Sequence, residues 1–115
     1  LVNILSQPVD YNDIKAVSNF LDQIINHTIQ HFESEEKLMA QSHFPHYREH
    51  IAEHNQLINE LQMMRRRLKP HTIPLIKSYI EEWLPDWLEQ HLQRNDSLLA
   101  AYLNESMDLE IKSIR

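Results

Sequence analysis

The chain has 115 residues, of which 42% are hydrophobic, and these values suit one small soluble domain with a single core. Seventeen acidic residues against eleven basic ones give a net charge of −6, which disfavours nucleic acid and anionic membranes as partners. There is no cysteine or glycine but there are eight histidines, so helices are favoured and any metal would take nitrogen and oxygen ligands. No segment is apolar enough to span a membrane, and we expect a cytoplasmic protein.

The first predicted elements are the end of one helix and a second, long amphipathic helix. Residues 1–6 are typical of the last turns of a helix, and a corner follows at Pro8. A long helix should begin near Tyr11 to Asp13, because apolar residues then recur every three or four positions. Its predicted inward stripe is Ile14, Val17, Phe20, Leu21, Ile24, Thr28, His31, Glu35, Leu38 and Met39.

Two further helices are predicted, separated by proline-marked corners. Pro45 precedes the first of them, and the corner at residues 69–74 precedes the second, which Pro85 should kink or divide. The inward residues of the first are Tyr47, His50, Ile51, His54, Leu57, Ile58, Leu61 and Leu68. Those of the second are Ile76, Ile80, Leu84, Trp87, Leu88, His91, Leu98 and Tyr102. We therefore predict an all-α domain over residues 1–103, with residues 104–115 as a tail or connector.

Ionisable residues on the inward faces carry the main functional signal. His31 and Glu35 are one helical turn apart, as are His50 and His54, so each pair lies about 6 Å apart and can share an ion. One histidine on an apolar stripe is usually a hydrogen-bonded core residue. Several imidazoles and carboxylates together, with His91 on the last helix, are hard to satisfy without a cation. Mixed imidazole and carboxylate ligands indicate iron, manganese or zinc rather than calcium or magnesium.

The spacing of His91 and Asp96 leaves two interpretations open. Residues five positions apart in a regular α-helix point about 140° away from each other, so both could not reach one site. A π-type bulge between them would supply the missing rotation. Otherwise Asp96, which follows Asn95, is a solvent-facing or capping acid.

Three runs of the sequence resemble the successive signatures of the hemerythrin family, in the order and spacing that the family has. They are His31-Phe32-x-x-Glu35-Glu36, Phe44-Pro45-x4-His50-x3-His54 and Trp87-Leu88-x-x-His91-Leu92-x3-Asp96. The resemblance covers roughly residues 1–103. It implies an up-down-up-down four-helix bundle, the architecture for which myohemerythrin is a standard example, with a first helix that is truncated or incomplete here.

The resemblance also implies a ligand set. His50, His54 and His91 would bind one iron, and His31 would bind the other. Glu35 and Asp96 would bridge two non-haem irons, together with a solvent-derived oxo or hydroxo group. This reading makes Asp96 a ligand and the π-type bulge its consequence.

Other histidines stand apart from these signatures. The family has one more histidine ligand on the first helix, and its position would fall before Leu1. His27, one turn before His31, is either a substitute ligand or a boundary residue bonded to a neighbour. We interpret His43, His46 and His71 as surface residues.

The resemblance supports several functions. The first is reversible binding of dioxygen or another small ligand, as a carrier, store or delivery module rather than an enzyme. The second is an oxygen or redox sensor that acts through residues 104–115 on a downstream output domain. The third is turnover of peroxide or nitric oxide, and the simplest is a metal-free bundle. A shortened first helix would expose an apolar groove, which predicts a homodimer.

Overall fold

The computed structural model describes residues 2–91 and 101–102, with the backbone alone at residues 2 and 3. All regular structure within these ranges is helical, and they contain no strand. The elements in chain order are α1 (Val2–Leu5), α2 (Ile14–Gln41), α3 (Tyr47–Arg66), the 3₁₀ turn η1 (Pro70–Thr72), α4 (Ile73–Ser78), the π turn η2 (Tyr79–Trp83) and α5 (Leu84–His91). The all-α prediction is confirmed.

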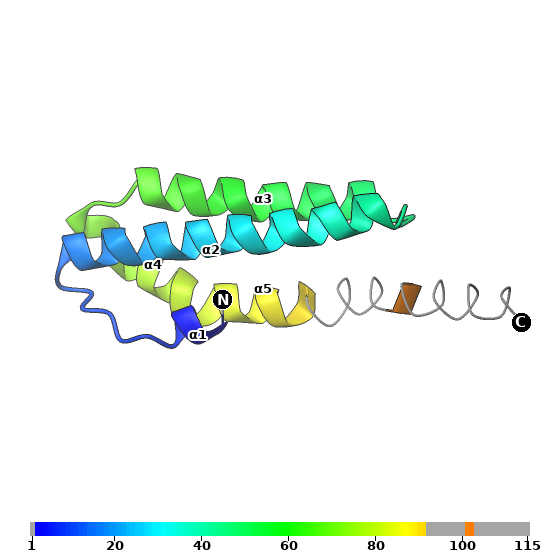
Figure 1. Ribbon diagram of the computed structural model, residues 1–115. Helices are drawn as coiled ribbons and strands as arrows, with labels where there is room; N and C mark the ends of the chain where they lie inside the picture. The colour runs from blue at the N-terminus through cyan, green and yellow to red at the C-terminus, as the bar shows by residue number, and fades with distance from the viewer. Residues whose placement is uncertain (1, 92–100, 103–115) are drawn as a thin grey trace, which may run out of the picture.

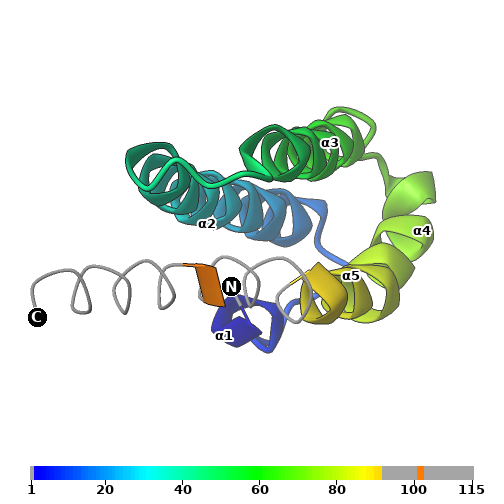
Figure 2. The same ribbon diagram turned by 90° about the vertical axis from the view of Figure 1, so that its right-hand side faces the viewer.

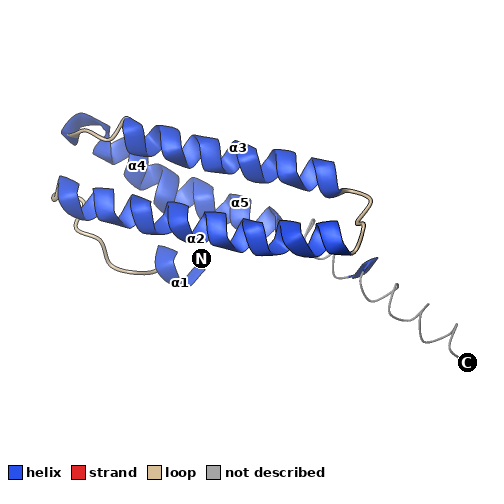
Figure 3. Ribbon diagram, turned by 45° about the horizontal axis from the view of Figure 1, so that its top comes forward, coloured by secondary structure: helices blue, strands red, loops and turns tan. Residues whose placement is uncertain are grey.

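The helices form a bundle in which the first helix is only one turn long. Helices α2 and α3 run antiparallel side by side, and α4, η2 and α5 follow one another in a third arm beneath them (Figures 1 and 2). The short α1 packs against α2, and Ile4 joins the common core (Figure 3). The predicted bundle with a truncated first helix is therefore confirmed. None of the described helices combines the length and apolarity of a membrane span.

Both ends of α2 are set by specific local bonds. Asp13 Oδ1 accepts hydrogen bonds from the backbone N–H groups of Lys15 (3.0 Å) and Ala16 (3.4 Å), which caps the helix where the sequence predicted its start. At the other end, Phe44 N donates to Met39 O (3.0 Å) in a Schellman motif. This motif needs a left-handed residue, and His43 takes that conformation with φ 55° because the chain has no glycine.

The main core lies between the N-terminal half of α2, the C-terminal half of α3 and the arm from α4 to α5. Its fully buried members are mostly aliphatic, and each stabilises the fold by about 1.5–3 kcal/mol. They include Val17, Leu21, Ile24, Leu57, Leu61, Ile76, Ile80 and Leu84. Most of the predicted stripe is confirmed, but Ile14 and Leu38 are exposed, at the margins of the buried face.

The irregularity in the last arm lies just before Pro85. Proline has no N–H to donate to the carbonyl of Glu81, and the helix widens there into the π turn η2. Leu84 N donates to Tyr79 O across this turn. The turn precedes His91, so it leaves the spacing between His91 and Asp96 unchanged. The bulge predicted between those two residues lies outside the described residues.

Candidate metal centre

Three helices bring buried imidazoles and a carboxylate together at one end of the bundle. His50 and His54 face inward from α3, and His91 is the last residue of α5. All three side chains are almost completely buried. Glu35 reaches them from α2, with only 9% of its side chain exposed. Four ionisable groups from three helices thus share one small interior volume.

The ligand-type atoms of these residues converge. His54 Nε2 lies 3.2 Å from His91 Nε2, and Glu35 Oε1 lies 3.5 Å from His54 Nε2 and 3.4 Å from His50 Nδ1. One such atom from each of Glu35, His54 and His91 lies within 4.8 Å of the others. Two imidazole nitrogens bound to one metal ion at about 2.1 Å are themselves roughly 3.0–3.4 Å apart. The observed spacing fits a shared cation.

Two outer carboxylates fix the orientation of the imidazoles. His54 Nδ1 lies 3.2 Å from Glu36 Oε1, and His91 Nδ1 lies 3.3 Å from Glu53 Oε2. An ionised carboxylate only accepts hydrogen bonds, so both Nδ1 atoms carry the proton and donate. In the neutral rings, both Nε2 atoms then hold lone pairs that face each other across 3.2 Å. Such lone pairs repel unless a cation lies between them.

His50 supports the same conclusion. Its ring is buried, and no described group forms a hydrogen bond with its Nε2 atom. Its Nδ1 atom lies near Glu35 without the alignment of a hydrogen bond. A buried polar atom without a partner costs about 1–3 kcal/mol, which a metal bond would offset. The residues present therefore fit a metal such as iron, manganese or zinc.

Aromatic side chains hold the imidazoles in place. The Phe32 ring stacks on His54 at 3.7 Å with an angle of 6°, and the Trp87 ring stacks on His91 at 4.7 Å with an angle of 11°. Phe44 meets the edge of His50 at 5.4 Å. These contacts restrict ring rotation and exclude water from the site.

Burial also decides the charge of His91. Desolvation lowers the pKa of His91 below its usual value, and the neighbouring His54 lowers it further, against the opposing effect of Glu35 and Glu53. The imidazole is therefore neutral near pH 7. Only the neutral form has the lone pair that binds a metal.

His31 lies at the margin of this cluster rather than inside it. Its side chain is 52% exposed, and its Nε2 atom lies 3.4 Å from Glu35 Oε2. The prediction that His31 lies on the buried stripe is thus wrong, because the described residues around it leave about half of its side chain exposed. The other oxygen of the same carboxylate faces His50 and His54. Glu35 therefore lies between His31 and the buried histidines.

The remaining predicted residues separate into two groups. Asp96 lies outside the described residues. His27 is exposed on α2, and His43, His46 and His71 are exposed as predicted.

Sequence reasoning missed the supporting residues of the site. Phe32 was left off the predicted stripe although it is buried, and neither Glu36 nor Glu53 was assigned a role. The available signal was adjacency, since Glu36 follows Glu35 and Glu53 precedes His54. Adjacency alone does not show that a carboxylate reaches a histidine on another helix.

The fold and the cluster define a helical bundle with a buried site of imidazole and carboxylate groups that can bind metal. Residues 2–103 match the family described as the Hemerythrin HHE cation binding domain. Bacteriohemerythrin of Aquifex aeolicus (strain VF5) is 28% identical over 107 residues, which cover 91% of this chain and 81% of that protein. No solved structure gives a significant match. The chain belongs to the hemerythrin HHE cation-binding family, which confirms the resemblance seen in the sequence.

Proposed function

We propose that this domain is a non-haem di-iron protein that binds dioxygen reversibly, as a carrier, store or delivery module. His50, His54 and His91 would hold one iron, His31 would hold the other, and Glu35 and Asp96 would bridge them with an oxo or hydroxo group. The irons would supply the reversible redox chemistry that dioxygen binding needs. The family membership supports this assignment.

The observation that carries the proposal is the convergence of lone pairs. His54 and His91 each donate at Nδ1 to an outer carboxylate, so their Nε2 atoms face each other at 3.2 Å as acceptors. Glu35 Oε1 adds a third acceptor to the same volume. One ligand-type atom from each of Glu35, His54 and His91 thus lies within 4.8 Å of the other two, and this convergence supports a cation site.

The chain's own residues have distinct tasks in this scheme. Glu35 divides its two oxygens between the buried histidines and the half-exposed His31, an arrangement suited to a bridging carboxylate. Glu36 and Glu53 hold the ring tautomers and make the ligand nitrogens more basic. The greater exposure of His31 favours ligand entry on its side of the cluster.

The proposal is tested by exposing the reduced, iron-loaded protein to dioxygen and then removing the gas. We expect an absorption change that reverses over repeated cycles with little loss of amplitude. The exposed Glu33→Gln variant should behave like the wild type, whereas His54→Ala should give no such change. Irreversible oxidation in the first cycle would contradict reversible binding. Peroxide or nitric oxide consumption well above that of free iron would favour an enzyme instead.

A further inference from the structure

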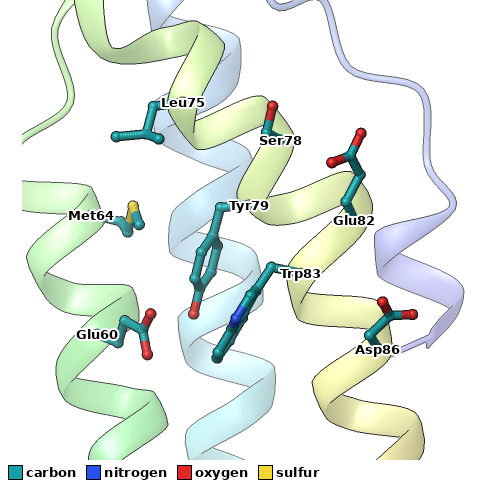
Figure 4. A pocket seen from close by; sticks show the side chains of 8 residues that line it. All are labelled: Glu60, Met64, Leu75, Ser78, Tyr79, Glu82, Trp83 and Asp86. Carbon is teal, nitrogen blue, oxygen red and sulfur yellow. The ribbon is translucent and has the colours of Figure 1, made fainter.

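An open pocket lies outside the metal centre, between α3 and the arm that holds η2. Its volume is about 450 Å³. Its lining residues are Glu60, Met64, Leu75, Ser78, Tyr79, Glu82, Trp83 and Asp86. Figure 4 shows Glu60 and Met64 on one wall, facing Tyr79 and Trp83. Tyr79 lies twelve residues before His91, or roughly 18 Å along the helix axis. None of the lining residues belongs to the metal cluster.

The pocket is negatively charged. Three carboxylates line it, and none of its lining residues is basic. No ion pair joins Glu60, Glu82 or Asp86 to any cation among the described residues. Glu60 is the most enclosed of the three, and desolvation raises its pKa above the usual value. A cationic ligand would restore the balance of charge.

A buried hydroxyl group gives an independent indication of a ligand. Tyr79 is only 7% exposed, and no described group forms a hydrogen bond with its Oη atom. In Figure 4 the hydroxyl end of this ring turns toward the side of the pocket where Glu60 lies. Burial raises the pKa of Tyr79 far above its usual value, and the charge of Glu60 adds to this effect. The hydroxyl therefore stays protonated, so it can accept a hydrogen bond from a ligand and donate one to it.

The aromatic wall lies on the π turn. Tyr79 and Trp83 are the first and last residues of η2, and side chains four positions apart are neighbours on one face of a helix. Their rings stack at 4.8 Å with an angle of 18°. Trp83 remains 43% exposed, so a flat apolar surface is open to a ligand beside the carboxylates. π turns of this kind occur often at functional sites.

We propose that this pocket binds an amidinium or guanidinium group carried on an apolar stem. The planar cation would pair with the Glu60 carboxylate, donate a hydrogen bond to Tyr79 Oη and place its flat face against Trp83. Such a group stacks on aromatic rings and matches a carboxylate with two parallel hydrogen bonds. Its source is either a small free molecule or the arginine side chain of a peptide.

The test is calorimetric titration of the full chain with benzamidine, with its neutral isostere benzamide and with a short capped peptide that contains one arginine. We expect benzamidine to bind at least about tenfold more tightly than benzamide, as a charged hydrogen bond requires. Binding of the peptide in place of benzamidine, with the same response to the variants below, would identify an arginine side chain as the source. No binding of either cation at millimolar concentration would overturn the proposal, as would equal affinity for benzamide.

Variants locate the binding within the pocket. Glu60→Gln should weaken binding by about tenfold or more, and the conservative Tyr79→Phe by about threefold. Glu89→Gln removes an exposed carboxylate from α5 outside the pocket, and it should leave affinity unchanged. If Glu89→Gln weakened benzamidine binding as much as Glu60→Gln does, the effect would be general charge attraction, and the proposed site would be wrong. All three variants should keep the wild-type metal content, which separates this proposal from that for the metal centre.

Discussion

The two ends of the bundle are built on opposite principles. At one end, Val17 and Leu21 on α2 pack against Leu61 on α3 and Ile80 at the π turn, in an apolar core. At the other end, the same helices bury three imidazoles and a carboxylate. The same helix pair, α2 and α3, contributes to both, so the backbone architecture does not distinguish them.

The difference lies in what completes each end. Apolar side chains satisfy one another by contact and need nothing further. At the other end the Nε2 atoms of His54 and His91 face each other at 3.2 Å, and no described group forms a hydrogen bond with the ring nitrogens of His50. The apolar end therefore stabilises the fold by burial alone, whereas the polar end is arranged to bind a cation.

The strongest way to separate the two ends is to truncate one residue in each. His54→Ala should abolish metal binding, because it removes a ligand and a stacked ring from the centre of the cluster. Leu61→Ala should cost about 2–5 kcal/mol of unfolding free energy but keep the full metal content of the folded protein. Metal analysis and chemical denaturation of both variants check the pair. A His54→Ala protein with wild-type metal content would refute the assignment.

Removal of the metal should destabilise only those proteins in which the metal centre is intact. A ligand present at about a thousand times its dissociation constant stabilises the folded state by about 4 kcal/mol, and a strong chelator should remove this contribution. Wild type and Leu61→Ala should lose comparable amounts of stability in thermal unfolding with chelator. His54→Ala, which has no metal to lose, should show no change. An equal response in all three proteins would show that the chelator acts elsewhere.

A smaller effect is expected from the carboxylates that orient the imidazoles. Glu36→Gln should weaken metal binding by about ten- to a hundredfold, because the amide is a weaker partner for His54 Nδ1 than the carboxylate is. Competition with a chromophoric chelator measures this change. Glu33→Gln on the exposed face of the same helix is the matched control and should have no effect. If Glu36→Gln and Glu33→Gln bound the metal with equal affinity, Glu36 would have no role in supporting the site.

The smallest predicted effect concerns the corner beside the polar end. His43→Gly should stabilise the fold by up to about 1 kcal/mol, because glycine adopts a positive φ without the steric cost borne by other residues. Metal content should not change, since His43 is exposed and lies outside the cluster. Denaturant titration checks the gain. A loss of metal on this substitution would indicate that the corner positions His50.

Helical periodicity predicted much of this structure. The burial of His50, His54 and His91 followed from their places in apolar stripes, and the same periodicity predicted the start of α2 near Tyr11 to Asp13. The exposure of His31 could not be predicted this way, because it depends on what lies opposite α2.

Contacts between side chains on different helices could not be predicted from the sequence either. The pairs of Glu36 with His54 and of Glu53 with His91 depend on how far one helix slides along another. A kink or division was predicted at Pro85, but the sequence did not show that its missing N–H would widen the preceding turn into the π turn η2. The bulge expected between His91 and Asp96 stays a prediction.

The most direct test of the central claim is metal analysis of the chain purified without added iron, read beside its near-ultraviolet spectrum. We expect close to two irons per chain and iron-dependent absorption that disappears together with the metal. A folded, fully stable protein that contains no metal, and takes up none when iron is supplied, would contradict the claim that the facing lone pairs of His54 and His91 are held by a cation.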